Sequence, residues 1–341
     1  MENIEKATIE TKINTNKPNM ITNTSNHLLD LDDLSTGDIE TIFSSTNAMK
    51  EILNRDIKKV PALRGKSIVT LFYEPSTRTR ASFEQAGKIL SADVINITNK
   101  SSSVEKGESL YNTVKTIEAM GVDIIIIRHP HSGAPYLIAR NVKASVINAG
   151  DGSHAHPTQA LLDMYTIINH FGSLKGLKIV IVGDILYSRV ARSNIIGLTK
   201  MGAEVVICGP HTLLPTELLN NHSLLPIITP FNSVRVETNI EHAMADADVV
   251  MALRIQLERQ STNHLPSLRE YSYRFQINKE RLNLAKPNVL VMHPGPMNEG
   301  VEISSDVAHG PKSVIEEQVS NGVAIRMAAL YWLSSPKRLE A

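Results

Sequence analysis

Short runs rich in isoleucine and valine recur along the chain from His27 onward. Runs that are apolar at nearly every position are typical of strands buried on both faces of a parallel sheet. Eight such runs occur, at residues 67–72, 93–98, 123–128, 144–149, 178–184, 204–209, 248–253 and 288–293. The pattern therefore predicts eight strands of buried parallel sheet.

The segments between these runs have apolar residues at helical spacing. In the segment 77–90, TRTRASFEQAGKIL, four apolar positions fall at i, i+3, i+4 and i+7, on one helix face. The segment 156–172 has Pro157 near its first turn and stops at Gly172, which are typical start and stop signals. The alternation of strands and helices predicts an α/β fold with helices on both faces of each sheet.

Four of the apolar runs precede residue 156 and four follow it, so we expect two α/β domains of similar size with the active site between them. Residues 1–26 are rich in Asn and Thr, and we expect them to form a disordered extension. The expected domains are 27–156 and 157–312. The last helical pattern, 313–333, is expected to pack back on the first domain.

Composition argues against several classes of function. Lys+Arg and Asp+Glu are equal at 35 each, so no global charge supports a nucleic-acid or membrane partner. No stretch approaches the roughly 18 apolar residues of a membrane span. Cys208 is the only cysteine and lies in an apolar run, so we expect a core residue and not a nucleophile. A chain without a possible intrachain disulfide fits a reducing compartment, and we expect a cytoplasmic location.

Polar segments follow the carboxyl ends of most of the apolar runs, and ligands of open parallel sheets bind beyond these ends. The segments are YEPSTRTR, NKSSSVEKGES, RHPHSG, GDGSHAHPTQ, GDILYSR, RIQLER and HPGPMNEG. We therefore expect them to converge on one cleft between the two domains.

The first of these segments has the composition of a phosphate site. A helix start offers free N–H groups and a positive dipole end, and Ser76, Thr77 and Thr79 add hydroxyl donors. Arg78 adds a planar guanidinium that suits phosphate oxygens. The alternative is a helix capped by Ser76 or Thr77 with solvated arginines. The segment is not a P-loop, because it lacks the glycine spacing and the GK[ST] ending.

Two further strand ends carry groups that can polarise a carbonyl. Arg128 ends one strand, and His156 begins a helix, where the helix field disfavours protonation of the imidazole. A metal site at His154 and His156 is the alternative, but no cysteine or carboxylate stands at a recognised ligand spacing. We therefore expect no metal.

Strand ends of the second half carry Arg189 and Arg254, which could clamp two carboxylates, with Gln256 two residues beyond. Two surface salt bridges are the alternative. The segment that includes GDILYSR has one glycine where a dinucleotide fingerprint has three, so nicotinamide binding is not expected.

The motifs FYEPSTRTR, RHP, HPTQALLD, RIQLER and HPGPMNEGVEI occur in an order that resembles aspartate carbamoyltransferase catalytic chains, within the aspartate/ornithine carbamoyltransferase superfamily. The resemblance covers residues from about 27 to 335. SVEKGE and RIQLER favour the aspartate enzyme over the ornithine enzyme. Ornithine carbamoyltransferases instead carry a Cys-Leu-Pro segment near the last strand, where this chain reads HPGP.

The resemblance implies transfer of the carbamoyl group of carbamoyl phosphate to L-aspartate, EC 2.1.3.2, in pyrimidine biosynthesis. The implied carbamoyl phosphate ligands are Ser76, Thr77, Arg78, Thr79, Arg128, His156, Gln159, Gly295 and Pro296. The implied aspartate ligands are Lys106, Arg189, Arg254 and Gln256. The implied catalytic residues are Arg78, Thr79, Lys106, Arg128 and His156. Ser102 and Lys106 would come from a neighbouring subunit of a homotrimer, and no cofactor is implied.

Two positions depart from the family pattern: Glu105 stands where some members have a second lysine, and Glu299 where arginine is frequent. Either could weaken aspartate affinity. Association with regulatory chains or with another pyrimidine enzyme stays open. A transcarbamylase for another amino acid and a non-catalytic binding subunit are the competing hypotheses.

Overall fold

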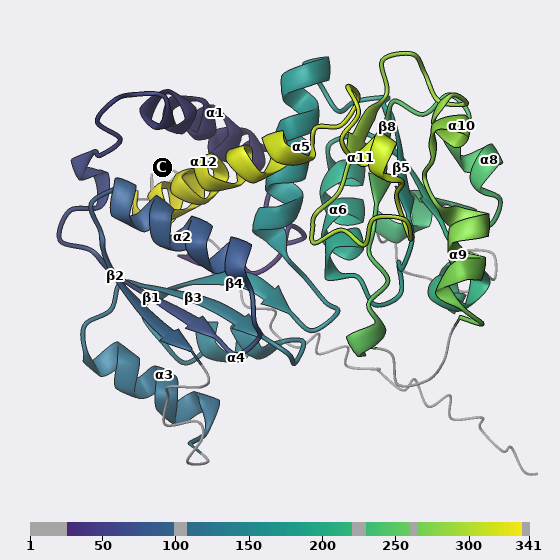
Figure 1. The fold of residues 1–341 in the computed structure, drawn as a ribbon. Helices are drawn as coiled ribbons and strands as arrows, with labels where there is room; N and C mark the ends of the chain where they lie inside the picture. Colours follow the sequence, from purple (N-terminus) through teal and green to yellow (C-terminus); the bar gives the residue numbers. More distant parts are fainter. Residues whose placement is uncertain (1–25, 99–107, 220–229, 260–264, 336–341) are drawn as a thin grey trace, which may run out of the picture.

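The computed structural model describes residues 26–98, 108–219, 230–259 and 265–335. Two predictions concern residues outside this described part. They are the disorder of residues 1–26, of which only residue 26 is described, and the roles of Ser102, Glu105 and Lys106. The described chain forms two parallel sheets with helices on their faces (Figure 1). The predicted fold class is confirmed.

The first sheet has the strand order β2-β1-β3-β4 and the second has the order β7-β6-β5-β8-β9. The strands of the first sheet are β1 (Ser67–Phe72), β2 (Asp93–Thr98), β3 (Ile124–His129) and β4 (Ser145–Asp151). Those of the second are β5 (Lys178–Val182), β6 (Glu204–Cys208), β7 (Arg235–Glu237), β8 (Val249–Ala252) and β9 (Leu290–Met292).

Each of the eight predicted runs contains a strand, but the pattern missed β7. This strand has only three residues, two of them charged, and it pairs with β6 alone at the edge of the sheet. Its exposed or half-buried side chains give no apolar run, so hydrophobic periodicity could not find it.

The helices of the first half are α1 (Thr36–Leu53), α2 (Thr77–Ile89), α3 (Leu110–Ala119), α4 (Ala134–Ala139) and α5 (Pro157–Phe171). Those of the second half are α6 (Arg189–Lys200), α7 (Thr216–Leu219), α8 (Ile240–Met244), α9 (Leu268–Phe275), α10 (Lys279–Leu282), α11 (Ser305–Ala308) and α12 (Ile315–Ser334). Short 3₁₀ turns lie at η2 (Pro61–Leu63), η5 (His211–Leu213), η7 (Pro230–Ser233) and η8 (Leu257–Arg259).

Local sequence explains where the long helices begin and end. Ser35 and Asp38 form a capping box at the start of α1, each side chain bonding the other's backbone N–H. Helix α5 begins with Pro157 and ends at Gly172, which adopts the left-handed conformation that glycine favours.

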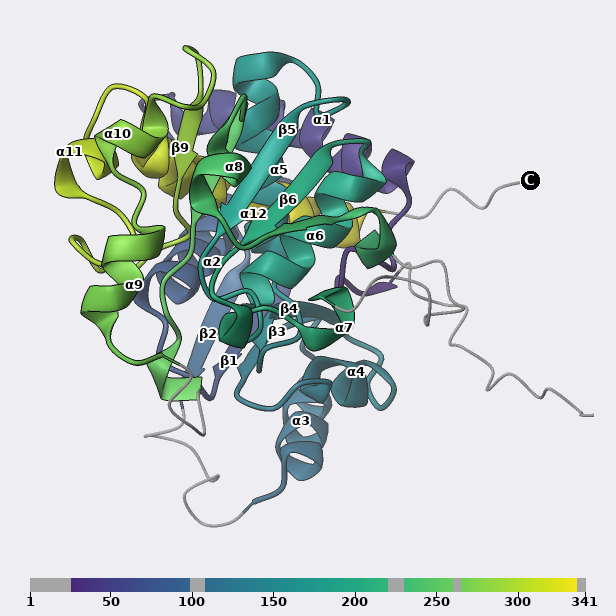
Figure 2. The ribbon, with the colours of Figure 1, turned by 90° about the vertical axis from the view of Figure 1, so that its right-hand side faces the viewer.

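Helix α12 joins the two halves of the molecule. It lies against α1, α2 and α5, although it follows the second sheet in the sequence (Figures 1 and 2). Its residues from Ala324 to Leu330 are all buried, as expected for a helix that is covered on every side. Arg326 on this helix lies 5.2 Å from the ring centroid of Phe83 in α2.

Cys208 is fully buried at the end of β6, and burial raises the pKa of its thiol to about 12. The expectation of a core cysteine is confirmed. No helix among the described residues is long and apolar enough to cross a membrane.

Candidate active site

A cleft of ≈ 1410 Å³ is lined by the segments that follow β1, β3, β4, β5, β8 and β9. It lies at the carboxyl ends of the strands of both sheets, where ligands of such sheets bind. Its lining includes two glutamates, Glu74 and Glu258, and six arginines: Arg78, Arg128, Arg189, Arg254, Arg259 and Arg326. The cleft is therefore strongly cationic in a chain whose formal net charge is zero.

We call seven cleft residues of α2, β3 and α5 and their N-caps the first-domain wall: Ser76, Thr77, Arg78, Thr79, Arg128, His156 and Gln159. We call four of the cleft residues that follow β5 and β8 the second-domain wall: Arg189, Arg254, Gln256 and Arg259. All described residues that the sequence proposed for the site line this cleft. They are the members of these two walls other than Arg259, with Gly295 and Pro296.

The start of α2 forms one end of the first-domain wall. Ser76 is the N-cap residue, but its side chain makes no capping hydrogen bond. Ser76 therefore does not cap α2 with its side chain, as the purely structural alternative would require. The N–H groups of the first turn and the Ser76 hydroxyl lie beside Arg78 on the cleft, a geometry suited to an anion.

Glu74 links the two walls. Phe72 pairs in register with Arg128, so the chain two residues beyond β1 lies beside the end of β3. Glu74 Oε2 lies 3.2 Å from Arg128 Nε and 2.7 Å from Arg189 Nη2. Burial and the neighbouring Arg189 lower the pKa of Arg128 to about 9. One carboxylate thus holds two cations that would otherwise repel each other.

A glycine allows the two arginines to approach the backbone closely. Gly150 has φ +116, and a Cβ atom there would lie 2.8 Å from Arg189 Nε and 3.2 Å from Arg128 Nη1. Arg189 Nη1 donates to the carbonyl of Gly152 at 3.1 Å. A side chain at position 150 would occupy the space that the guanidinium groups take.

His156 is 3% exposed and stays neutral at physiological pH, because burial and then Arg128 lower its pKa well below the usual value. The direction agrees with the sequence prediction, which cited only the helix field. The backbone N–H of His156 donates to Ser193 Oγ at 2.9 Å, while its Nδ1 is buried without a hydrogen-bond partner. A neutral ring of this kind can donate one hydrogen bond to a carbonyl oxygen.

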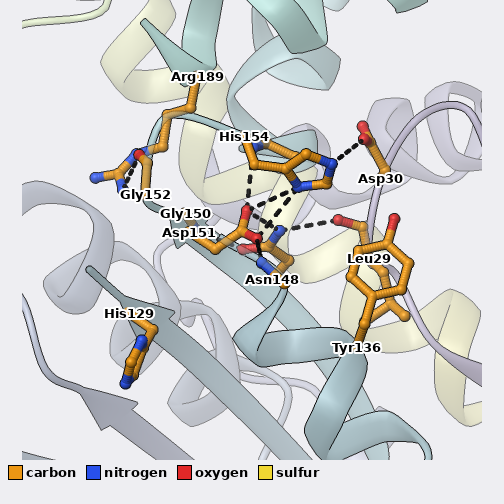
Figure 3. Close-up of polar contacts among 12 residues, drawn as sticks. Leu29, Asp30, His129, Tyr136, Asn148, Gly150, Asp151, Gly152, His154 and Arg189 are labelled. Carbon is orange, nitrogen blue, oxygen red and sulfur yellow. Dashed lines mark hydrogen bonds and ion pairs between the residues drawn. The ribbon is translucent and has the colours of Figure 1, made fainter. Parts of the chain in front are cut away.

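His154 does not contribute to the cleft. Its Nδ1 lies 3.2 Å from Asp151 Oδ2 and its Nε2 lies 3.7 Å from Asp30 Oδ2 (Figure 3). Asp151 also accepts from Asn148 Nδ2 and from the N–H of Ala155. This buried cluster fixes the turn between β4 and α5 that carries His156. Among the described residues, no group of three or more His, Cys, Asp or Glu side chains could hold a metal ion.

The residues of the second-domain wall follow two paired strands. Val182 at the end of β5 pairs with Ala252 at the end of β8, so the segments that follow these strands are neighbours. Asp184 is fully buried and accepts from the N–H of Gln256 at 3.0 Å. Arg254 forms an ion pair with Glu258 and lies 3.3 Å from Gln256 Oε1. Burial and Arg189 lower the pKa of Arg259, whose Nη1 donates to the carbonyl of Tyr187.

The loop after β9 reaches across to the first-domain wall. His293 Nδ1 accepts from the N–H of Gly295 at 2.8 Å, so the ring proton is on Nε2, which lies 3.1 Å from Glu302 Oε1. A Cβ atom on Gly295 would lie 3.0 Å from the guanidinium carbon of Arg78. The loop backbone is therefore packed against the proposed phosphate ligand.

Glu299 does not line the cleft. It is exposed and lies 3.1 Å from His309 Nε2. The glutamate that departs from the family pattern therefore forms a surface pair with His309, outside the site.

Five charged residues of the site were missed by the sequence reasoning: Glu74, Asp163, Glu258, Arg259 and Arg326. Four of them lie inside the quoted motifs FYEPSTRTR, HPTQALLD and RIQLER, so a signal was present. Arg326 lies in the last helix, and nothing in its local sequence relates it to the cleft.

The fold and site define a two-domain α/β protein whose arginine-lined cleft is suited to anionic small molecules. Residues 26–169 match the family described as aspartate/ornithine carbamoyltransferase, carbamoyl-P binding domain. Residues 175–333 match the aspartate/ornithine carbamoyltransferase, Asp/Orn binding domain. The chain belongs to the aspartate/ornithine carbamoyltransferase family, and the resemblance drawn from its motifs is confirmed.

Relatives from both branches of the family match the chain. The chain is 56% identical over 313 residues to the aspartate carbamoyltransferase catalytic subunit of Dehalococcoides mccartyi strain CBDB1, covering 92% of this chain and 93% of the relative. The Trypanosoma cruzi aspartate transcarbamoylase in complex with carbamoyl aspartate and phosphate is 28% identical, with a TM-score of 0.78 and coverage of 89% and 94%.

Ornithine carbamoyltransferase from Pyrococcus furiosus gives the same TM-score, 0.78, at 30% identity, with coverage of 89% and 95%. The fold therefore does not distinguish the two acceptors. The sequence identity to the Dehalococcoides mccartyi protein favours the aspartate branch.

Proposed function

We propose that the chain transfers the carbamoyl group of carbamoyl phosphate to the α-amine of L-aspartate, giving N-carbamoyl-L-aspartate and phosphate. This is the activity of EC 2.1.3.2 and a step of pyrimidine synthesis. The high identity to catalytic subunits of that name supports the reaction. The observation in the structure that best supports it is the convergence of six arginines on one cleft.

In the proposed arrangement the first-domain wall binds carbamoyl phosphate. The start of α2 and Arg78 bind the phosphate group, where N–H groups and a guanidinium face the cleft. Thr79, Arg128 and the neutral His156 donate to the carbamoyl oxygen, and Gln159 contacts the amino end. The backbone at Gly295 and Pro296 completes the site beside Arg78.

The second-domain wall binds aspartate. Arg189 and Arg254 are assigned to its two carboxylates, and Gln256 lies within reach of Arg254. A cationic acceptor such as ornithine would be repelled by these arginines. The two walls face each other across the cleft, so the amine and the carbonyl carbon can be held in line for attack.

The chemistry then needs no protein nucleophile. The uncharged amine attacks the carbonyl carbon, and negative charge develops on the carbonyl oxygen. Preorganised donors to that oxygen contribute roughly 3–4 kcal/mol each to lowering the barrier. The bond from the carbonyl carbon to the phosphate oxygen breaks, phosphate leaves with the electron pair, and the proton that the amine loses passes to the departing phosphate. Arg78 stabilises the leaving phosphate.

The family resemblance also supports a homotrimer in which Ser102 and Lys106 reach a neighbouring subunit's site. These two residues lie outside the described part of the chain. The single cysteine supports the proposed cytoplasmic location. Light scattering on the purified chain tests the trimer, because a monomeric mass would remove this part of the proposal.

The direct test is phosphate release from carbamoyl phosphate with aspartate, with ornithine and with no acceptor. Fast release with aspartate alone is expected. Arg78→Ala should abolish turnover while the protein stays folded by circular dichroism. Substantial residual activity in that variant would remove the phosphate assignment. Release with ornithine would overturn the roles of Arg189, Arg254 and Gln256.

A further inference from the structure

Behind the first-domain wall lies a carboxylate that no step of the proposed reaction uses. Asp163 is fully buried on α5, four residues after Gln159 and on the same helix face. Its Oδ1 accepts from Gln159 Nε2 at 3.0 Å and from Gln318 Nε2 at 2.7 Å. Its Oδ2 accepts from Asn194 Nδ2 at 2.8 Å. One carboxylate thus binds three side-chain amides from α5, α6 and α12.

An ionised carboxylate accepts hydrogen bonds and cannot donate them, so it determines which end of each amide faces it. The Gln318 amide agrees with this rule, because its Oε1 accepts from the N–H of His293 at 2.9 Å while its Nε2 faces Asp163. Burial raises the pKa of Asp163 to about 6, so the group is ionised at the mildly alkaline pH of an assay.

The same rule applies to Gln159, which lines the cleft and is 8% exposed. With its Nε2 bound to Asp163, its carbonyl oxygen is the end of the amide turned away from Asp163 and can accept from a ligand. Without Asp163 the amide could turn and present its NH₂ group instead.

We propose that Asp163 is a positioning residue that fixes Gln159 as a hydrogen-bond acceptor toward the cleft and thereby selects a carbamoyl phosphate over an acyl phosphate of the same shape. The inference rests on the proposed contact between Gln159 and the carbamoyl amino group. Carbamoyl phosphate has an NH₂ donor there, whereas acetyl phosphate has a methyl group. A fixed acceptor gains a hydrogen bond from carbamoyl phosphate, whereas acetyl phosphate leaves it buried without a partner.

Asp163 also holds three helices together, so its replacement will weaken the fold whatever its effect on Gln159. A purely structural role would weaken the binding of both phosphates alike. The ratio of their dissociation constants is therefore the informative quantity, because only loss of the fixed acceptor changes it.

The experiment measures the dissociation constants of carbamoyl phosphate and of acetyl phosphate by calorimetry, with the full chain and no acceptor present. In Asp163→Ala and Asp163→Ser the preference for carbamoyl phosphate should fall about tenfold, the loss of one hydrogen bond. Serine is the variant more certain to fold, since its hydroxyl can bond the helix carbonyl four residues back, as Thr166 does to Leu162.

Two controls make the result specific. Asp163→Asn keeps a carbonyl oxygen for Gln159, and Asn194, whose Oδ1 is buried without a partner, can turn to accept from the new amide. This variant should keep the preference within about twofold. Asn194→Ala removes a partner of the other carboxylate oxygen and should also leave the preference unchanged.

The outcomes separate this inference from the proposed function. An unchanged preference in both Asp163→Ala and Asp163→Ser, with a lost preference in Gln159→Ala, would overturn the role of Asp163 alone. An unchanged preference in Gln159→Ala would overturn the proposed contact of Gln159 with the carbamoyl group. A lost preference in Asn194→Ala would show a general structural effect and would also overturn the inference.

Discussion

The arginines of the cleft are held in two different ways. Arg128 and Arg189 have side chains 14% and 3% exposed, and both lie against Glu74, which follows β1. Arg254 has a side chain 24% exposed and contacts Glu258 and Gln256, both within four residues of it in the sequence. The first pair is held by distant parts of the chain, whereas Arg254 is held locally.

This difference indicates which interactions are preorganised. A buried ion pair at fixed geometry is costly to disrupt, while an exposed pair between residues four apart contributes little. Groups that polarise a carbonyl benefit from being fixed before the reaction begins. A ligand for an incoming carboxylate can instead exchange one anionic partner for another. We therefore expect the first-domain wall to determine the rate and Arg254 to determine acceptor affinity.

Replacement of Arg128 by alanine should have the largest of the effects that test this difference. It removes a donor to the developing oxyanion, so kcat should fall about 1000-fold. Steady-state phosphate release at saturating substrates measures the change. Arg140→Ala, which replaces an exposed arginine outside the cleft lining, is the control and should keep wild-type kcat. An Arg128→Ala variant with more than a tenth of wild-type kcat would contradict the expectation that the first-domain wall determines the rate.

The buried carboxylate behind the first-domain wall should make stability depend on pH. The pKa of Asp163 is raised by burial from 3.8 to about 6, so the folded state holds its proton more tightly than the unfolded state does. The contribution is therefore fully present at low pH and is lost as pH rises from about 4 to about 6. The loss should be on the order of 3 kcal/mol in the free energy of unfolding.

Asp163→Asn removes this titration and is the reference. Burial raises the pKa of Asp30 to about 6 as well, so the wild-type curve alone cannot assign the effect. Urea unfolding of both proteins between pH 4 and 7 gives the difference. A difference that stays constant over this range would show that Asp163 does not titrate as described.

Replacement of Arg254 by alanine tests the other wall. One charge-assisted contact to the aspartate carboxylate is lost, so KM for aspartate should rise about 100-fold. The affinity for carbamoyl phosphate should stay within about twofold. Arg274→Ala is a matched control, because Arg274 pairs with Glu270 at the same i,i+4 spacing on an exposed helix. A parallel loss of carbamoyl phosphate affinity would mean that the walls do not act separately.

The sequence predicted which residues line the cleft where those residues follow buried strands. Arg128, Arg189 and Arg254 follow or end apolar runs, and a parallel sheet brings such positions to one edge. The prediction was incomplete where a side chain acts through tertiary contacts. Asp163 lies inside a quoted motif, but only the packing of α5 against α6 and α12 reveals its three amide partners.

The causes of the lowered pKa of His156 could not be predicted from the sequence either. The neutral state of His156 was expected from its place at a helix start. Its larger causes are burial and Arg128, both of which depend on the fold.

Strand β7 could not be predicted for a different reason. It carries no apolar run, and its place in the sheet comes from pairing with β6.

The smallest of the expected effects concerns the loop between the walls. Gly295 has φ +65, and a Cβ atom would lie 3.0 Å from both Cζ and Nη1 of Arg78. Gly300 has φ +84 and no atom within 4 Å of the equivalent point. Both alanine variants should lose roughly 1–2 kcal/mol of stability from the left-handed backbone. Only Gly295→Ala should also displace Arg78.

The comparison of the two glycine variants therefore isolates the contact with Arg78. We expect KM for carbamoyl phosphate to rise about tenfold in Gly295→Ala, equivalent to one weakened hydrogen bond, and to stay unchanged in Gly300→Ala. Phosphate release at varied carbamoyl phosphate measures this, with urea unfolding as the stability reference. Equal KM values in the two variants would mean that Arg78 adjusts freely. In that case the first-domain wall would be less preorganised at its phosphate end than at Arg128, where Glu74 and the close backbone of Gly150 fix the guanidinium.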